Sequence, residues 1–409
     1  MSGLGAAVVG AGERVPLLTV AREWARIGCL GFGGPPAHIS LLRRLCVTDR
    51  RWLSEGEFED GIAATNMLPG PASTQLAIFC AWRLRRTAGA VIGGLCFLVP
   101  GLLLILVLAA VFLGSPPTWA RGAAAGAGAA VAAVAVHAAF GLVPGSWRRA
   151  TVSPDNQSGR TTFETSRRLR WAGYVGAGVL AGALLGRYLV LVLVACGLLE
   201  IGARRSWPRT PRVDGNLSVF PLAALSTIGA GGIGGLAWVA LKVGLLSYGG
   251  GFVIIPLMQS DAVQRYHWMT DGQFLNAVAL GQLTPGPVVQ TVAVVGYAAA
   301  AGLGGGLLAA LLAFTPSFVM VLAGAGRFDR LRANPTVEAF LTGAGPSVVG
   351  AIAGSAVPLA RALSQPWQYA VLAGALGWLL ALRRGVVSTL LLAAAVGAVG
   401  VSLGLTAST

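Results

Sequence analysis

Charged residues are scarce in this chain. Only 11% of its 409 residues are Asp, Glu, Lys or Arg, whereas soluble domains carry about a quarter. Lysine occurs once, as Lys242. Hydrophobic residues make up 55% of the chain, and the mean hydropathy is +0.72. A water-soluble protein of this size could not bury that much apolar surface, so the composition excludes a soluble enzyme.

Catalytic and metal-binding patterns are also missing from the sequence. The five cysteines show no CxxC spacing, and no GxSxG, HExxH or P-loop motif occurs. We therefore expect no disulfide framework, no metal, no cofactor and no enzymatic activity. The missing P-loop also argues against an ATP-driven pump. An intramembrane enzyme would need a catalytic acid, a nucleophile or a metal cluster, and the sequence offers none.

Long apolar runs are what the sequence does contain. Ala88–Gly114 and Trp119–Leu142 can each cross a hydrocarbon core about 30 Å thick. The expected fold class is therefore an all-α polytopic membrane protein, with the lipid bilayer as its surroundings. A formal net charge of +15 would suggest nucleic acid in a soluble protein. Here most arginines fall in short loops, where membrane topology requires them, so no nucleic-acid partner is expected.

An internal repeat organises the chain. Residues 27–100 align without a gap over residues 243–316, at a constant offset of 216. The matched motifs are GFGGPPAHI over SYGGGFVII, Trp52-Leu-Ser-Glu-Gly over Trp268-Met-Thr-Asp-Gly, and Pro69-Gly-Pro71 over Pro285-Gly-Pro287. Matches at a fixed offset indicate two homologous halves.

The repeat predicts the domain boundaries. The first half is expected at 1–203 and the second at 242–409. A linker and a connecting transmembrane helix are expected between them, at 204–241. The polar stretch 144–170 has no apolar period and is expected to be a mobile loop.

Loop arginines predict how the halves are oriented. In the first half, arginines at 43–51 and at 83–86 lie on both sides of the Pro-Gly-Pro segment, which is therefore expected to enter the membrane and return. In the second half, the loop after the Pro-Gly-Pro segment has neither Lys nor Arg. The halves are thus expected to be inverted repeats with broken or re-entrant helices, an arrangement typical of secondary transporters.

The Pro-Gly-Pro segments carry the chemistry that we expect. The first proline disfavours helix at the residue before it, and the second fits the first turn of a new helix. The start of that new helix presents unpaired N–H groups and about half a positive charge. One such proline is usually only a kink. Two matched Pro-Gly-Pro segments beside two matched glycine clusters favour an anion-binding cradle near the middle of the membrane.

The residues expected to bind the anion come from the glycine clusters, the Pro-Gly-Pro segments and the polar side chains around them. They are Arg26, Phe32, Gly33, Gly34, His38, Asn66, Gly70, Ser73, Thr74, Gln75, Lys242, Gly249, Gly250, Gly251, Gln282, Gly286, Gln290 and Thr291.

Several of these residues have a second interpretation. Arg26 and Lys242 are at matched positions and would suit a doubly charged anion, but interfacial anchors would look the same. His38 could bind the anion, sense pH or serve packing through hydrogen bonds.

The motifs at Ser54 and Thr270 are expected to be capping boxes. Their acidic neighbours Glu55 and Asp271 would then lie in the first turn of each helix, although a proton-coupling role for them is the alternative.

These motifs resemble those of the chromate ion transporters. GFGGPPAHI, RRWLSEGEFED and LPGPASTQ resemble the N-terminal repeat of that family, and KVGLLSYGGGFVIIPL with LTPGPVVQT resembles the C-terminal repeat. The likeness covers nearly the whole chain and implies the fused two-domain form. Gly31 stands where family members often carry a small hydroxyl residue, which Ser247 keeps in the second half.

The resemblance implies a multi-pass protein of the bacterial cytoplasmic membrane that exports chromate, with sulfate as a related oxyanion. The expected mechanism is alternating access by a secondary carrier. An oxyanion channel or a sulfate-type importer with the same cradle is the alternative. The sequence leaves the oligomeric state open, a homodimer included.

Overall fold

The computed structural model is helical throughout the residues that it describes, which are 15–114, 116–151, 161–205, 232–247, 251–300, 302–324 and 334–404. No strand occurs within these ranges. In lipid every backbone N–H and C=O must find a partner inside its own segment, which α-helices achieve and open strands do not. The expected all-α architecture is confirmed.

Longer helices alternate with short turns of tighter or wider helix along the described chain. The helices are α1 (Leu17–Leu30), α2 (Pro35–Arg43), α3 (Glu55–Thr65), α4 (Ala72–Leu113), α5 (Thr118–Thr151), α6 (Thr161–Leu180), α7 (Leu189–Arg205), α8 (Ile233–Leu246), α9 (Ile254–Gln259), α10 (Asp271–Leu283), α11 (Thr291–Ala299), α12 (Leu303–Gly324), α14 (Pro335–Arg361), α15 (Pro366–Leu376) and α16 (Val386–Ser402). Short π- or 3₁₀-helical turns join several of them, namely η1 (Arg44–Asp49), η2 (Ala181–Leu185), η3 (Gly186–Tyr188), η5 (Ser260–Arg265), η6 (Val288–Gln290) and η7 (Gly377–Ala381).

Four of the described helices are long and apolar enough to cross a membrane: α4, α5, α12 and α14. The helix α4 is broken where Arg85 and Arg86 leave helical geometry, with φ of −141° and +51°. Its first part, 72–84, rises about 20 Å at 1.5 Å per residue, and α3 rises about 16 Å. Each is shorter than the hydrocarbon core. That this segment enters the membrane and returns stays a prediction.

The long helices α5 and α14 pack against each other at the centre, and each also packs on two helices of the other half. The helix α5 packs on α15 and α16, whereas α14 packs on α6 and α7. Glycines allow this close approach, because a Cβ added at Gly126 would collide with the backbone of Ala393, and one at Gly350 with the backbone of Val175. Small residues at helix interfaces are how membrane helices gain packing contacts.

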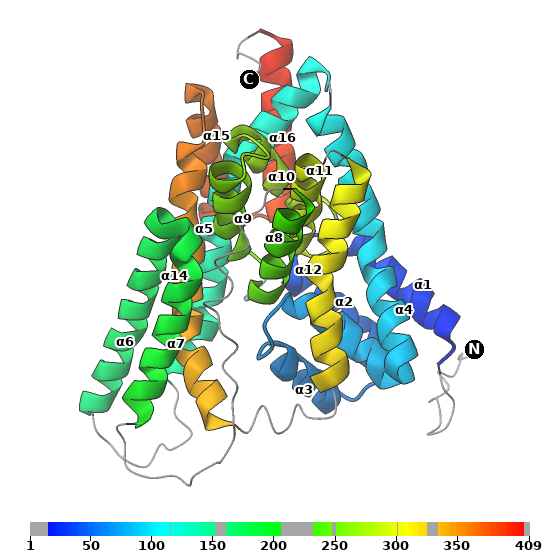
Figure 1. Ribbon diagram of the computed structural model, residues 1–409, viewed down its shortest axis with the longest axis vertical. Coiled ribbons are helices and arrows are strands. Elements are labelled where there is room, and N and C mark those ends of the chain that lie inside the picture. The colour runs from blue at the N-terminus through cyan, green and yellow to red at the C-terminus, as the bar shows by residue number, and fades with distance from the viewer. Residues whose placement is uncertain are drawn as a thin grey trace, which may run out of the picture.

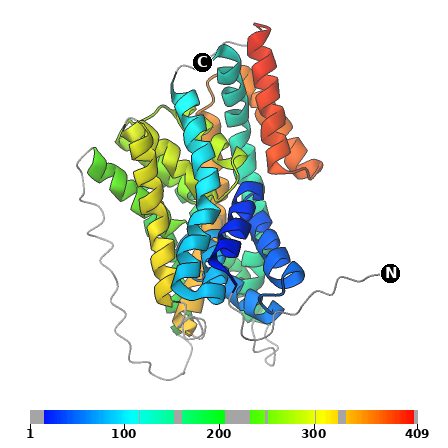
Figure 2. The ribbon, with the colours of Figure 1, turned by 90° about the vertical axis from the view of Figure 1, so that its right-hand side faces the viewer.

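The helix pairs α6/α7 and α15/α16 lie at opposite ends of the long axis (Figure 1). The helix α3 lies toward the lower end with α6 and α7, and α10 lies toward the upper end with α15 and α16. In the view turned by 90°, α16 is again at the upper end, while the blue helices near the N-terminus occupy the lower half (Figure 2).

Local structure recurs at the spacing of the sequence repeat. The ranges of α1 and α8 differ by 216 residues at both ends, and so do those of the π-helical turns η1 and η5. Positive φ angles recur at Arg51 and His267 and at Gly70 and Gly286. Both expected capping boxes are present, from Ser54 to Glu57 and from Thr270 to Gln273. The inverted relation of the two halves stays a prediction.

Two expected boundaries differ from the structure. The stretch 144–170 is not a loop at its ends, since α5 continues to Thr151 and α6 begins at Thr161. Pro144 is accommodated inside α5, and the Trp171 indole donates to the Ser146 hydroxyl at 3.1 Å, which ties the two helices together. Residues 233–241, expected in the connecting segment, belong to α8; residues 217–231 lie outside the described part.

Candidate functional site

Both Pro-Gly-Pro segments break the helix as expected. Gly70 and Gly286 have φ of +124° and +109°, a region that glycine adopts readily and other residues avoid. After the first break, α4 begins at Ala72 behind an extended Pro71. After the second, the 3₁₀ turn η6 precedes α11. The amide of Gln75 bonds to Pro71 and that of Gln290 to Pro287, so the preceding amides remain available.

The glycine cluster of the first half starts α2. Gly33 and Gly34 have φ of +97° and +75°, and Gly34 is the N-cap. The next two residues, Pro35 and Pro36, have no N–H, and the following amides, Ala37 and His38, both bond to the Gly34 carbonyl. The start of α2 therefore contributes no free amide to the expected cradle.

The second glycine cluster is described only at its last residue. Gly251 has φ of +89°, and Gly249 and Gly250 lie outside the described part of the chain. A Cβ added at Gly251 would lie 3.4 Å from the Val288 Cβ and 3.5 Å from the Ser247 hydroxyl oxygen. The second glycine cluster thus borders the second break.

The halves meet at the second break. The Gly286 amide donates to the Gly31 carbonyl at 3.0 Å. The Gln290 side-chain amide donates to the Leu98 carbonyl in α4 at 2.8 Å. A Cβ added at Gly101 would collide with the Pro285 carbonyl oxygen. The helix α4 of the first half thus packs directly on the break of the second.

At the first break, the helix α12 of the second half packs on the Pro-Gly-Pro segment of the first half. Ser317 of α12 is fully buried and is matched to Gly101 by the offset of 216. Its hydroxyl oxygen lies 3.1 Å from where a Gly70 Cβ would be. The side-chain amide of Gln75 donates to the Pro69 carbonyl at 2.7 Å, and this bond joins the first turn of α4 to the residue before Gly70.

His38 links the first glycine cluster to the first break. Its Nε2 lies 2.9 Å from the Gly31 carbonyl and its Nδ1 lies 3.3 Å from the Ser73 hydroxyl. The carbonyl can only accept, so Nε2 carries the proton and Nδ1 accepts from Ser73. The ring is fully buried and meets the Phe97 ring edge-on at 5.0 Å. Both ring nitrogens are occupied, which favours the packing interpretation of His38.

Unpartnered hydrogen-bond donors gather around the two breaks. The hydroxyls of Thr74, Ser247 and Ser317 and the side-chain amide nitrogen of Gln282 are buried without a hydrogen-bond partner. The side-chain oxygens of Gln75 and Gln290, which can only accept, are also unpartnered. Within the described residues the backbone amides at 72–74 and at 288–289 also have no acceptor. Buried polar groups are nearly always paired, so a cluster of unpaired donors points to a ligand.

Ser247 and Ser317 were not among the residues predicted to bind. Ser317 could have been found from the repeat, because Pro100-Gly101 is matched to Pro316-Ser317. Thr291 is less available than predicted, since its hydroxyl donates to the Val288 carbonyl at 2.8 Å.

The remaining predicted residues lie at the edge of this cluster or away from it. Asn66 is the half-buried C-cap of α3, and Phe32 is 42% exposed. The Arg26 side chain is 72% exposed and lies 4.0 Å from Glu23. Lys242 is mostly buried and pairs with the buried carboxylate of Asp261. Lys242 is thus engaged by a carboxylate, whereas Arg26 is largely exposed.

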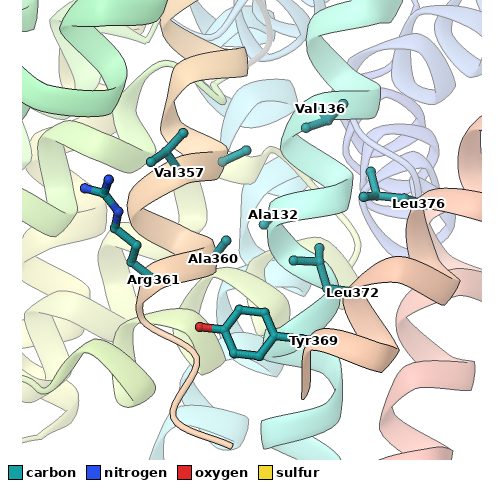
Figure 3. A pocket seen from close by; sticks show the side chains of 9 residues that line it. Ala132, Val136, Val357, Ala360, Arg361, Tyr369, Leu372 and Leu376 are labelled. Atoms are coloured by element: carbon teal, nitrogen blue, oxygen red, sulfur yellow. The ribbon is translucent and has the colours of Figure 1, made fainter. Parts of the chain in front are cut away.

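A cavity of about 350 Å³ lies elsewhere, between α5, α14 and α15. Its lining is apolar apart from Arg361 and the hydroxyl of Tyr369, which points toward α14 (Figure 3). None of the residues at the breaks lines it. A cavity with so few donors does not suit an anion. Within the described residues, no group of three His, Cys, Asp or Glu side chains could hold a metal ion.

Comparison with known proteins gives consistent matches over most of the chain. A family model described as chromate transporter matches residues 18–201 and 234–401. A chromate transport protein of Cupriavidus metallidurans is 31% identical over 348 residues, which cover 82% of this chain and 80% of that protein.

Two further relatives match to a similar extent. A chromate transport protein of Pseudomonas aeruginosa is 31% identical over 84% of this chain and 81% of its own length. An uncharacterized transporter of Methanocaldococcus jannaschii is 25% identical over 86% of this chain and 85% of its own length. No solved structure matches the chain.

Proposed function

Since this chain belongs to the chromate transporter family, we propose that it exports chromate from the bacterial cytoplasm as a multi-pass secondary transporter of the cytoplasmic membrane. The observation that carries the binding site is the cluster of unpartnered buried donors at the two interlocked breaks. The named relatives are transport proteins, which supports a transporter over an enzyme.

The donor cluster suits a tetrahedral dianion. Hydroxyl and amide groups replace the water that chromate loses on entering the protein, and hydrogen bonds to a charged partner contribute about 1.5–3 kcal/mol each. Because Lys242 is engaged by Asp261 and Arg26 is largely exposed, this proposal assigns the anion to the dipoles of these donors. Such a site binds without trapping, which a carrier needs in order to release its cargo. Sulfate has similar size and charge and would use the same donors.

Membrane energetics favour export over import. Moving one elementary charge across 100 mV changes its free energy by about 2.3 kcal/mol. A dianion that leaves a cell negative inside therefore lowers its free energy by about 4–5 kcal/mol per 100 mV. A carrier that alternates between two inverted halves would use this gradient. The positions of α6/α7 and α15/α16 at opposite ends of the molecule support that arrangement (Figure 1).

Inside-out vesicles that contain the protein are expected to accumulate chromate, because uptake into them corresponds to export from the cell. Excess sulfate is expected to reduce the initial rate through competition for one site. Collapsing the membrane potential and the pH gradient separately will show which of them drives uptake. A chromate flux that sulfate leaves unchanged would refute a shared oxyanion site.

The alternatives give different results in cells that express the protein. An exporter lowers cellular chromate, whereas a sulfate-type importer raises it. A channel gives flux that does not saturate with chromate concentration. Either of these outcomes would replace the proposed direction or mechanism while leaving the family unchanged.

Replacing Thr74 by valine is expected to weaken chromate binding about tenfold or more, because one donor to a charged ligand is lost while the side-chain shape is kept. The matched control is Thr315→Val, since Thr315 is exposed and bonds to its own helix carbonyl Leu311 at 2.7 Å. The measurement is the chromate concentration that gives half-maximal uptake. Equal values for the two variants would remove Thr74 from the site.

A further inference from the structure

The lower ends of α5, α6 and α7 form an arginine-rich surface that the transport site does not use (Figure 1). Among the side chains that the structure describes in this region are six arginines and two glutamates. The arginines are Arg148, Arg149, Arg167, Arg168, Arg170 and Arg204, and the glutamates are Glu200 and Glu338. Loop arginines predict that this end is cytoplasmic.

The glutamates are already engaged by two of the arginines. Glu200 is 4% exposed and accepts from Arg170 Nε at 3.0 Å, from Arg204 Nε at 3.1 Å and from the Tyr174 hydroxyl at 3.1 Å. Arg204 also reaches Glu338 at 3.5 Å. The carboxylates therefore hold the inner part of the cluster through Arg170 and Arg204.

Three guanidinium groups remain unpaired with any described carboxylate. They belong to Arg148, Arg149 and Arg167. Arg148 bonds only to the Pro144 carbonyl of its own helix, at 3.3 Å. Guanidinium groups match the geometry of phosphate oxygens and bind them through two hydrogen bonds.

Aromatic residues place this surface at a membrane boundary. The rings of Trp147 and Trp171 meet edge-on at 4.9 Å, and the Arg168 guanidinium lies 5.9 Å from the Trp147 ring. Tryptophan is enriched at the headgroup level of bilayers. Leu169, Leu198 and Leu199, adjacent in sequence to the cluster, are 68%, 58% and 62% exposed. Basic and apolar surface thus occur together.

We propose that this surface binds the phosphate headgroup of an anionic membrane lipid, through Arg148, Arg149 and Arg167, with the acyl chains along the exposed leucines. The cleft beside it, between Arg167, Trp171 and Glu200, encloses only about 10 Å³, too little to hold a ligand. The lipid headgroup would therefore lie across the surface. Clusters of arginines on the cytoplasmic side are attracted to anionic lipid at about 1 kcal/mol per residue.

The test is phosphatidylglycerol binding to the purified full-length protein in zwitterionic detergent, measured by native mass spectrometry. Arg149→Gln with Arg167→Gln is expected to weaken binding about thirtyfold, equivalent to about 2 kcal/mol. Arg383→Gln with Arg384→Gln is the matched control, because it removes two exposed arginines from the turn between η7 and α16 and is expected to bind as the unmodified protein does. Arg149→Lys with Arg167→Lys keeps the charge and is expected to retain most of the binding.

Three results would overturn the proposal. They are equal binding of phosphatidylcholine, equal loss in the control and the glutamine variants, and displacement of the lipid by equimolar inorganic phosphate or glycerol phosphate. The last would identify a soluble phosphate compound as the ligand. If the glutamine pair gives no folded protein, Arg149→Gln alone is compared with Arg384→Gln. The readout is lipid binding, so it does not depend on which anion the protein transports.

Discussion

Replacing Lys242 by methionine is expected to lower the free energy of unfolding by about 3–5 kcal/mol, because it leaves the buried carboxylate of Asp261 without its partner. The Asp261 side chain is 2% exposed and the Lys242 side chain 15%, so water cannot compensate for the lost ammonium group. The measurement is the midpoint of thermal or denaturant unfolding of the purified protein. Arg26→Met is the matched control, since Arg26 is at the equivalent position but 72% exposed, and it should change stability little.

The double variant Lys242→Met, Asp261→Leu separates the ion pair from simple packing. Position 261 is matched to Leu45 in the first half, which shows that leucine is tolerated in the equivalent turn. Buried pairs replaced by apolar residues of similar size are often neutral in stability. We expect the double variant to recover most of the loss. A double variant as unstable as the single one would mean that Lys242 acts through packing rather than through charge.

Gly101→Ala is expected to reduce chromate transport at least a hundredfold. The added methyl group would collide with the Pro285 carbonyl oxygen and lie 2.6 Å from the Gln290 side-chain oxygen. Under the proposed binding site, the break at Pro285-Gly-Pro287 holds amides that would face the anion. The helix α4 must move away from the break to accept the methyl group, and the donor cluster then loses its geometry. The collision is with backbone, which cannot rotate aside, and overpacking of this kind costs about 1–3 kcal/mol.

The control for this variant is Gly345→Ala in α14, where an added Cβ meets nothing within 4 Å. It should leave transport unchanged. Both proteins are compared for initial chromate uptake at equal amounts in the membrane. Full transport by Gly101→Ala would show that the close contact between α4 and the second break is not required for binding.

The local features of this protein could be predicted from its sequence because they depend on neighbouring residues alone. The Pro-Gly-Pro breaks follow from the missing N–H of proline and the conformational freedom of glycine. The capping boxes at Ser54 and Thr270 follow from side chains that bond to amides three residues away. The limits of α5 were predicted less well, because Pro144 does not end a helix whose neighbour α6 supports it.

The cluster of unpartnered donors, which is the candidate binding site, could be predicted only in part. The sequence placed Thr74 and Gln282 among the residues expected to bind. It gave Arg26 and Lys242 the same interpretation, because the two residues are at matched positions in the repeat. Their surroundings differ, since Lys242 is mostly buried and pairs with Asp261, whereas Arg26 is 72% exposed and its neighbour Glu23 pairs more closely with Arg50. Ser317 was not among the predicted residues, although the match of Pro316-Ser317 to Pro100-Gly101 in the repeat pointed to its position.

The sequence by itself determined a helical membrane protein built from two related halves, each broken at a glycine cluster and at Pro-Gly-Pro, because hydropathy and backbone stereochemistry act over a few residues. Only the tertiary structure decided that α4 of the first half packs on the break of the second and α12 on the break of the first. It also decided which donors remain unpaired, since pairing depends on groups that are far apart along the chain and meet only when the helices pack.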